Sequence, residues 1–105
     1  MANSISREEL LIEELKDPEF AVTYLNECLN SIDGETPEMT KNIFLKSLRR
    51  VIQAQGMSKI SRLAGLNRAN LYQQIKEEGQ PGFDTVLSIL NSLDINIRLV
   101  PKKKI

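Results

Sequence analysis

Apolar residues recur at helical spacing along most of the chain, in stretches separated by glycine or proline. The first stretch begins with a capping box, because Ser6 is followed three residues later by Glu9. This pattern predicts a helix from about Arg7 to Lys16. Its apolar side would consist of Leu10, Leu11 and Leu15.

Two further helices are predicted by a repeated signal, a capping side chain directly before a proline. The pairs are Asp17-Pro18 and Thr36-Pro37. The helices they start are expected to span 18–32 and 37–55, and a glycine follows each of them closely. Cys28 falls within the apolar stripe of the first of these two helices, so we expect it to be a core residue.

Shorter elements follow. Ser58 is predicted to cap a helix over 59–64, which Gly65 ends, and Asn67 to cap another helix that reaches about Glu78. A turn over 79–82 then leads to a sixth helix. Its expected inner face consists of Phe83, Val86, Leu87, Leu90 and Leu93.

The segment 95–100 alternates apolar and polar residues with the period of a strand. It has no obvious partner strand within the chain, so we expect it to pair with the same segment of a second copy. The predicted fold is therefore mostly α, a bundle of about six helices with one C-terminal β-strand paired across a dimer. The residues predicted to form the dimer contact are Ile95, Ile97 and Leu99.

Length and composition narrow the range of functions. A chain of 105 residues is enough for one compact domain with one core. It contains no histidine and a single cysteine, so the usual metal sites and histidine-dependent catalytic groups lack their parts. We expect no enzyme activity, no metal and no cofactor. No apolar run approaches the roughly 20 residues that cross a bilayer, and no signal-peptide pattern is present, which favours a cytoplasmic protein.

Charge is distributed unevenly. Residues 1–40 contain ten acids against two bases, a local charge of −8, and residues 41–105 contain twelve bases against four acids, a local charge of +8. No acid occurs between positions 41 and 76. A basic half of this kind is typical of polyanion binding, although ordinary solvated helix faces would produce the same pattern. We therefore expect an acidic N-terminal helical arm (1–34), a domain with the basic window and the strand (35–100) and a basic tail (101–105).

The basic window contains the pattern of a helix-turn-helix, two short helices joined by a tight turn with a glycine. Gly65 can take positive φ at low cost, which lets the chain reverse. The shared core is expected to consist of Ile60, Leu63, Leu66, Leu71 and Ile75, with Ser61 small enough to let the two backbones approach.

The polar side of the second short helix fits the major groove of DNA, where arginine pairs with guanine and glutamine with adenine. The predicted base-reading residues are Arg68, Ala69, Tyr72 and Gln73. Helix starts and neighbouring polar side chains can hold phosphates. The predicted phosphate-binding residues are Ser58, Lys59, Asn67, Lys76 and Gln80.

Each of these residues could instead be an ordinary surface residue that does not contact DNA. Tyr72 fits either the edge of a groove or the rim of the core. Arg49 and Arg50 fit a role in covering the helix surface or pairing with the acidic arm better than a role in DNA contact. Two short amphipathic helices around a glycine also occur in helical bundles that bind no DNA.

Four motifs occur in order along the chain: Phe44-Leu45-x-x-Leu48-x-x-Val51-x-x-Ala54-x-Gly56-Met57-Ser58, then Ala64-Gly65-Leu66-Asn67-Arg68-x-x-Leu71-Tyr72, then Gly79-x-Pro81, and Thr85-Val86-Leu87. Together they resemble the HigA-like addiction-module antidote proteins, which belong to the lambda-repressor-like, or Xre/Cro, group of DNA-binding domains. The resemblance implies a homodimeric transcriptional repressor that binds its own operator DNA and a toxin of the RelE/ParE type. Ser61 and Gln74 depart from the family pattern, which often has alanine and a small apolar residue there.

Two other functions remain compatible with these residues. A prophage-type regulator without a toxin would use the same DNA-binding side chains, and a helical adaptor would use the basic window to bind an acidic protein. The acidic arm has two interpretations as well. It would either attract a cationic toxin or serve as structural cover for the helical core.

Overall fold

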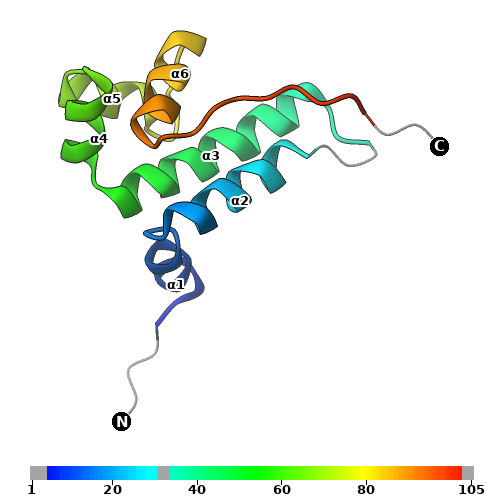
Figure 1. The fold of residues 1–105 in the computed structure, drawn as a ribbon, viewed down its shortest axis with the longest axis horizontal. Coiled ribbons are helices and arrows are strands. Elements are labelled where there is room, and N and C mark those ends of the chain that lie inside the picture. The colour runs from blue at the N-terminus through cyan, green and yellow to red at the C-terminus, as the bar shows by residue number, and fades with distance from the viewer. Residues whose placement is uncertain (1–4, 31–33, 103–105) are drawn as a thin grey trace.

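The computed structural model describes residues 5–30 and 34–102, and within these ranges the chain is mostly helical (Figure 1). The described helices are α1 (Arg7–Glu14), α2 (Pro18–Leu29), α3 (Pro37–Gln55), α4 (Met57–Ala64), α5 (Arg68–Ile75) and α6 (Phe83–Ser92).

The starts of the first three helices follow from side chains that bind free backbone amides. Ser6 and Glu9 form the predicted capping box, with both backbone-to-side-chain hydrogen bonds 3.0 Å long. Asp17 caps α2 and Thr36 caps α3, each directly before a proline. α3 has the predicted bounds and ends at Gly56, where φ is 102°.

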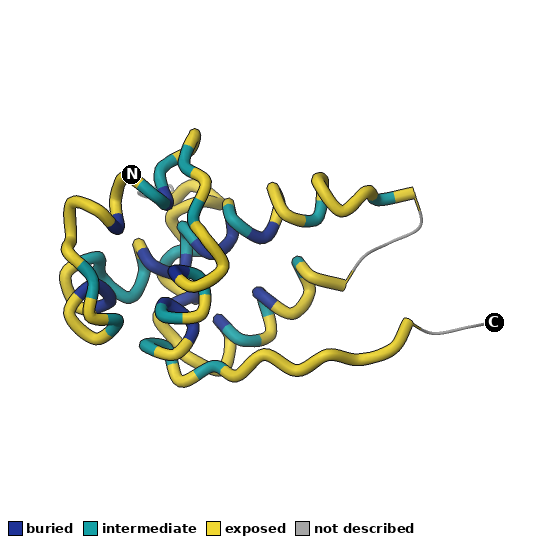
Figure 2. The backbone as a smooth tube through the Cα atoms, turned by 90° about the horizontal axis from the view of Figure 1, so that it is seen from above, coloured by how far each residue is buried: buried dark blue, intermediate teal, exposed yellow. Residues whose placement is uncertain are grey.

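The arrangement places α3 at the centre. α2 runs antiparallel beside it, α1 packs near the start of α2, and α4, α5 and α6 gather around the C-terminal half of α3 (Figure 1). Buried positions concentrate where these helices meet, whereas the C-terminal segment is exposed along most of its length (Figure 2).

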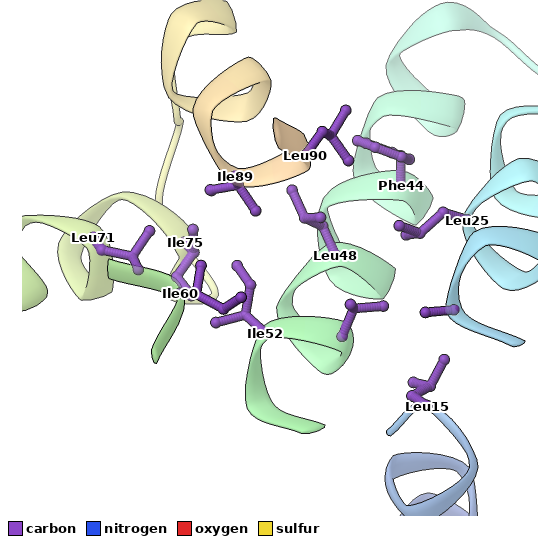
Figure 3. Packing of buried hydrophobic residues seen from close by; sticks show 12 residues of the cluster. Leu15, Leu25, Phe44, Leu48, Ile52, Ile60, Leu71, Ile75, Ile89 and Leu90 are labelled. Carbon is purple, nitrogen blue, oxygen red and sulfur yellow. The ribbon is translucent and has the colours of Figure 1, made fainter. Parts of the chain in front are cut away.

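One buried cluster joins all six described helices or the residue that ends them (Figure 3). Its members are Leu15, Ala21, Leu25, Phe44, Leu48, Val51, Ile52, Ile60, Leu71, Ile75, Ile89 and Leu90. Leu15, Ala21 and Leu25 come from the acidic arm, so the arm and the basic half contribute to a single core. The division of the chain at residue 34 stays a prediction based on charge.

The start of α4 and the end of α5 differ from their predicted positions. α4 begins at Met57, with Gly56 rather than Ser58 as its N-cap, so the predicted Ser58 cap is wrong. α5 ends at Ile75 instead of about Glu78, because Lys76 leaves the helical conformation with ψ of 168°. The predicted end of the second helix at Ile32 lies outside the described residues.

Three predicted core faces also differ from the structure, and in α1 the predicted core residue Leu10 is 52% exposed. Leu63 is 48% exposed, so it is not part of the core that Ile60, Leu71 and Ile75 form. In α6 the buried residues are Thr85, Ile89 and Leu90, whereas Phe83 and Leu87 are exposed. Helical spacing defines a broad apolar stripe, and the side that faces the core depends on where the neighbouring helices lie.

The predicted C-terminal strand does not form in the described chain. The N–H of Ile95 donates to the carbonyl of Leu90 over 2.9 Å, and residues 96–102 make no backbone hydrogen bond to another described segment. A strand needs a partner to pair its backbone groups, and the chain offers none there. The segment runs as an extended tail back along α2 and α3 (Figure 1).

Candidate nucleic-acid interface

α4 and α5 are two helices of eight residues joined by a turn of three, Gly65 to Asn67. Gly65 takes the left-handed conformation with φ of 70°, and the N–H of Leu66 returns to the carbonyl of Ser61 over 2.8 Å. Ser61 is buried, and its hydroxyl donates to the carbonyl of Ser58. Its burial fits the expectation that a small residue is needed here, and the close approach of the two backbones stays a prediction.

α5 has one buried side and one exposed side. Leu71 is fully buried and Ile75 nearly so. Its exposed residues are Arg68, Ala69, Asn70, Tyr72 and Gln73. Tyr72 is 54% exposed, so part of its side chain is accessible to a partner. The four predicted base-reading residues are therefore all accessible on α5.

The starts of α4 and α5 differ in their hydrogen bonding. Asn67 Oδ1 accepts from the backbone N–H groups of Ala69 and Asn70, at 2.8 and 3.2 Å. The first N–H groups of a helix have no partner within the helix, and at the start of α4 no capping side chain accepts from them either. Those amides can donate to an anion such as a phosphate oxygen.

The predicted phosphate-binding residues surround this pair of helices. Ser58 and Lys59 are exposed in the first turn of α4, and half-buried Lys76 follows α5. Gln80 lies in the next loop, where its Oε1 accepts from Lys41 Nζ over 3.4 Å. Lys59 also lines a hollow of about 560 Å³ between α2, α4 and the end of α6.

Asn70 is a surface residue of α5 that the sequence analysis did not single out. It is exposed, and its side chain makes no hydrogen bond within the described residues. Asparagine can pair with adenine through both polar atoms of its amide. Counting helix positions outward from buried Leu71 and Ile75 would have placed it beside Gln73.

Arg49 of α3 also reaches α5. Its Nε donates to the carbonyl of Ile75, and its Nη2 donates to the carbonyl of Lys76 over 3.3 Å. From the sequence, Arg49 was expected to cover the helix surface or to pair with the acidic arm. This contact was not predicted, because its two partners are 26 and 27 residues away along the chain.

The next residue, Arg50, turns toward the acidic arm. Its Nε lies 3.0 Å from a carboxylate oxygen of Glu8, and its Nη1 donates to the hydroxyl of Tyr24 over 3.1 Å. The hydrogen bond to Glu8, supported by the bond to Tyr24, raises the pKa of Arg50 above its ordinary value. The expectation that Arg50 pairs with the acidic arm is confirmed.

The arm itself presents a negative surface. The acids of α1 and of the start of α2 are all exposed, and they are Glu8, Glu9, Glu13, Glu14, Asp17 and Glu19. Lys16 pairs with one of them, Glu13, at 3.2 Å. α1 and the start of α2 lie on the opposite side of α3 from α5 (Figure 1), and Glu19 borders the hollow that Lys59 of α4 also lines.

The C-terminal tail borders a second hollow. It measures about 460 Å³ and lies between the tail, α2, α3 and α6. The predicted dimer residues Ile95, Ile97 and Leu99 all line it, together with apolar side chains such as Leu25, Phe44 and Leu90. Leu99 and Val100 are 92% and 76% exposed, so the end of the tail leaves apolar surface in water.

Other kinds of site have little support in the described part of the chain. No group of three or more cysteine or acidic side chains there is arranged to hold a metal ion. No helix there is long and apolar enough to cross a membrane.

Residues 8–101 match a family model described as "Probable addiction module antidote protein". The chain belongs to this family of addiction-module antidotes. A relative from Haemophilus influenzae, described as an uncharacterized protein, is 31% identical over 87 residues, which cover 83% of this chain and 82% of the relative. No solved structure matches the chain significantly.

Proposed function

We propose that this antidote is a sequence-specific DNA-binding repressor of its own operon and that it neutralises a toxin of the RelE/ParE type. In this proposal α4 and α5 form the helix-turn-helix of a HigA-like protein in the Xre/Cro group. Membership in the antidote family supports a toxin partner in general. It also favours this reading over a prophage-type regulator without a toxin.

The observation that carries the DNA-binding proposal is the two-sided character of α5. Leu71 and Ile75 hold the helix against the core, and the exposed side offers Arg68, Ala69, Tyr72 and Gln73. A helix held in this way can enter the major groove with its polar side, where Arg68 would read guanine and Gln73 adenine.

Phosphate contacts would come from the surroundings of α5. The uncapped start of α4 offers backbone N–H groups, Lys59 and Lys76 offer positive charge, and the amide group of Asn67 can still donate. Such contacts fix the position of the protein on DNA without reading sequence.

The test is a gel-shift assay on the DNA upstream of the protein's own gene, with Arg68→Ala as the variant. Loss of preference at one base position, at a cost of roughly 1–3 kcal/mol, is the expected result for direct readout. Log affinity should fall with log salt at a slope near −0.9 for each phosphate that the protein neutralises. Absence of salt-dependent binding to duplex DNA would contradict the proposal and favour a helical adaptor.

A homodimer is the second part of the proposal, because one short recognition helix reads few base pairs. The tail has unpaired backbone groups and exposed apolar residues beside an apolar hollow. Pairing of the tail with the tail of a second copy would supply the missing strand partner. It would also bury Ile97 and Leu99 in a shared apolar contact.

Size-exclusion chromatography with light scattering tests the dimer. Leu99→Glu should produce a monomer, whereas Val100→Glu, the neighbouring position whose side chain points to the other side of an extended segment, should disturb pairing less. A protein truncated after Leu93 that stayed dimeric would contradict pairing through the tail.

The third part of the proposal concerns the toxin. A ribonuclease of the RelE/ParE type binds RNA and is expected to be cationic, so the acidic surface of α1 and α2 would attract it. The alternative is that the arm serves only as cover for the core, and its buried residue Leu15 shows that it does contribute there.

Charge substitutions separate these two roles better than a deletion, since removal of residues 1–16 would also remove buried Leu15. Replacement of Glu13, Glu14 and Glu19 by glutamine keeps the core and removes three exposed charges. Slower association with the toxin encoded beside the gene is expected, while a control with Glu77 and Glu78 replaced by glutamine should associate at the original rate. Equal rates for both variants would leave the arm as structural cover.

A further inference from the structure

The C-terminal end of α5 is hydrogen-bonded to an arginine of a different helix, α3. Arg49 of α3 is half-buried, and its guanidinium donates to the carbonyls of Ile75 and Lys76. The last carbonyls of a helix have no partner within the helix, and the last turn of α5 has no basic residue of its own. Arg49 thus supplies both the hydrogen-bond donors and the positive charge that favour a helix C-terminus.

The contact from Arg49 constrains the orientation of α5 relative to α3 as well as the distance between the two helices. A guanidinium is planar, and two of its N–H groups donate to two successive carbonyls, which restricts the rotation of α5 relative to α3. The start of α5 is set separately by the turn at Gly65 and the cap at Asn67. With Leu71 as the buried anchor, Arg49 is the side chain of another helix that holds the far end of α5, where the N–H of Gly79 also donates to the carbonyl of Lys76 over 2.7 Å.

We propose that Arg49 is a positioning residue for sequence readout, which sets the orientation of α5 on DNA without touching DNA itself. The inference rests on the proposed function. Paired hydrogen bonds to a base edge depend on alignment, so a small rotation of α5 would weaken them at Gln73 while long, flexible side chains still reach phosphates. Loss of Arg49 should therefore reduce discrimination between sequences more than it reduces affinity for DNA in general.

Arg50 is a matched control for this test. It is the next residue of α3, is also half-buried, and also makes two side-chain hydrogen bonds, but its partners are Glu8 and Tyr24 of the arm. Arg49→Ala and Arg50→Ala each remove one guanidinium and one charge from the same helix. Only Arg49→Ala removes a contact with α5.

The measured quantity is the ratio of two affinities. One is for the duplex that the unmodified full-length chain enriches from a randomised pool, and the other is for a shuffled duplex of the same composition. Arg49→Ala should lower this ratio about tenfold while changing affinity for the shuffled duplex by about twofold or less. Arg50→Ala should leave the ratio unchanged. Arg49→Lys keeps the charge and can donate to one carbonyl, so it should restore part of the ratio.

Thermal melting of each variant accompanies the binding assay. If Arg49→Ala does not fold at the assay temperature, the comparison is made between Arg49→Lys and Arg50→Lys. Equal ratios for the paired variants overturn the inference, and so does an equal loss of affinity for both duplexes, which would make Arg49 a phosphate ligand. Failure of the unmodified chain to enrich any sequence overturns the proposed function and this inference with it.

Discussion

Arg50 and Glu8 lie 42 positions apart in the sequence, yet the arginine Nε and a carboxylate oxygen of Glu8 are only 3.0 Å apart. The pair joins central helix α3 to the first helix of the acidic arm. Together with the bond from Arg50 to Tyr24, it connects three helices at one guanidinium.

The contribution of this pair to stability should be small. The side chain of Glu8 is 54% exposed, and exposed ion pairs contribute about 0–1 kcal/mol. Glu8→Gln should therefore lower the free energy of unfolding by less than about 1 kcal/mol in a urea titration, with a smaller difference at high salt. Glu14→Gln, an exposed acid of the same helix, is the control. A large loss that salt does not change would show that the pair is shielded from water.

The capping box makes part of the stability dependent on pH. Hydrogen bonds from the backbone and side chain of Ser6 lower the pKa of Glu9 below its ordinary value of 4.5. Because the folded-state pKa is the lower one, the stabilisation is present above pH 4.5 and is lost as the pH falls through the folded-state pKa. The difference in unfolding free energy between the native protein and Glu9→Gln should shrink over that range. A difference that stayed constant with pH would mean that the carboxylate charge has no part in the cap.

A cavity beneath α5 should destabilise the protein strongly. Leu71 is fully buried, and removal of a buried leucine side chain usually costs about 2–5 kcal/mol. Leu71→Ala should therefore lower the free energy of unfolding by an amount in this range, as measured by urea denaturation. Leu63→Ala, at a position that is 48% exposed, should cost much less. Similar losses for the two variants would mean that Leu63 is covered in solution, for example by a partner.

The loop after α5 requires glycine at position 79 for reasons of space. A Cβ atom there would lie 2.1 Å from the carbonyl oxygen of Gln74, a backbone atom that has little room to move. Gly79→Ala should destabilise the protein by about 1–3 kcal/mol or shift the end of α5, measured by urea denaturation and by amide exchange near Ile75. Gln80→Ala in the same loop is the control. Unchanged stability and exchange would show that the loop can adopt another path.

Asn70 provides a test of readout that the sequence analysis did not include. If α5 enters the major groove, Asn70→Ala should relax preference at one base position and leave the salt dependence of binding unchanged. Selection from a randomised duplex pool measures the preference, and Asn91→Ala, an exposed asparagine of α6, is the control. A uniform loss of affinity across sequences would instead make Asn70 a phosphate contact.

Local signals in the sequence were sufficient where the structure is governed by neighbouring residues. The capping box at Ser6, the caps before proline, the end of α3 before Gly56 and the reversal at Gly65 all lie where the sequence predicts them. These features depend on hydrogen bonds and φ angles within a few residues, so the sequence contains all their components.

Features that depend on distant residues were predicted less well. Leu63 and Leu87 have the same helical spacing as core residues, but no neighbouring helix covers them, whereas Ile89 is fully buried. The contact from Arg49 to the end of α5 could not be predicted from spacing, because it depends on how α3 crosses that helix. The prediction of a strand over 95–100 was wrong for the single chain, because a strand requires a second segment to pair with its backbone groups.

The shared core has a further consequence for how the molecule comes apart. Gln55, at the end of α3, donates to the carbonyls of both Leu15 and Lys16, and Leu15 is sealed completely from solvent. Loss of the N-terminal helices by proteolysis would therefore strip the cover from α3, which also supports α4 and α5. If the proposed function holds, binding of the toxin and binding of the operator would be lost together after a single cut.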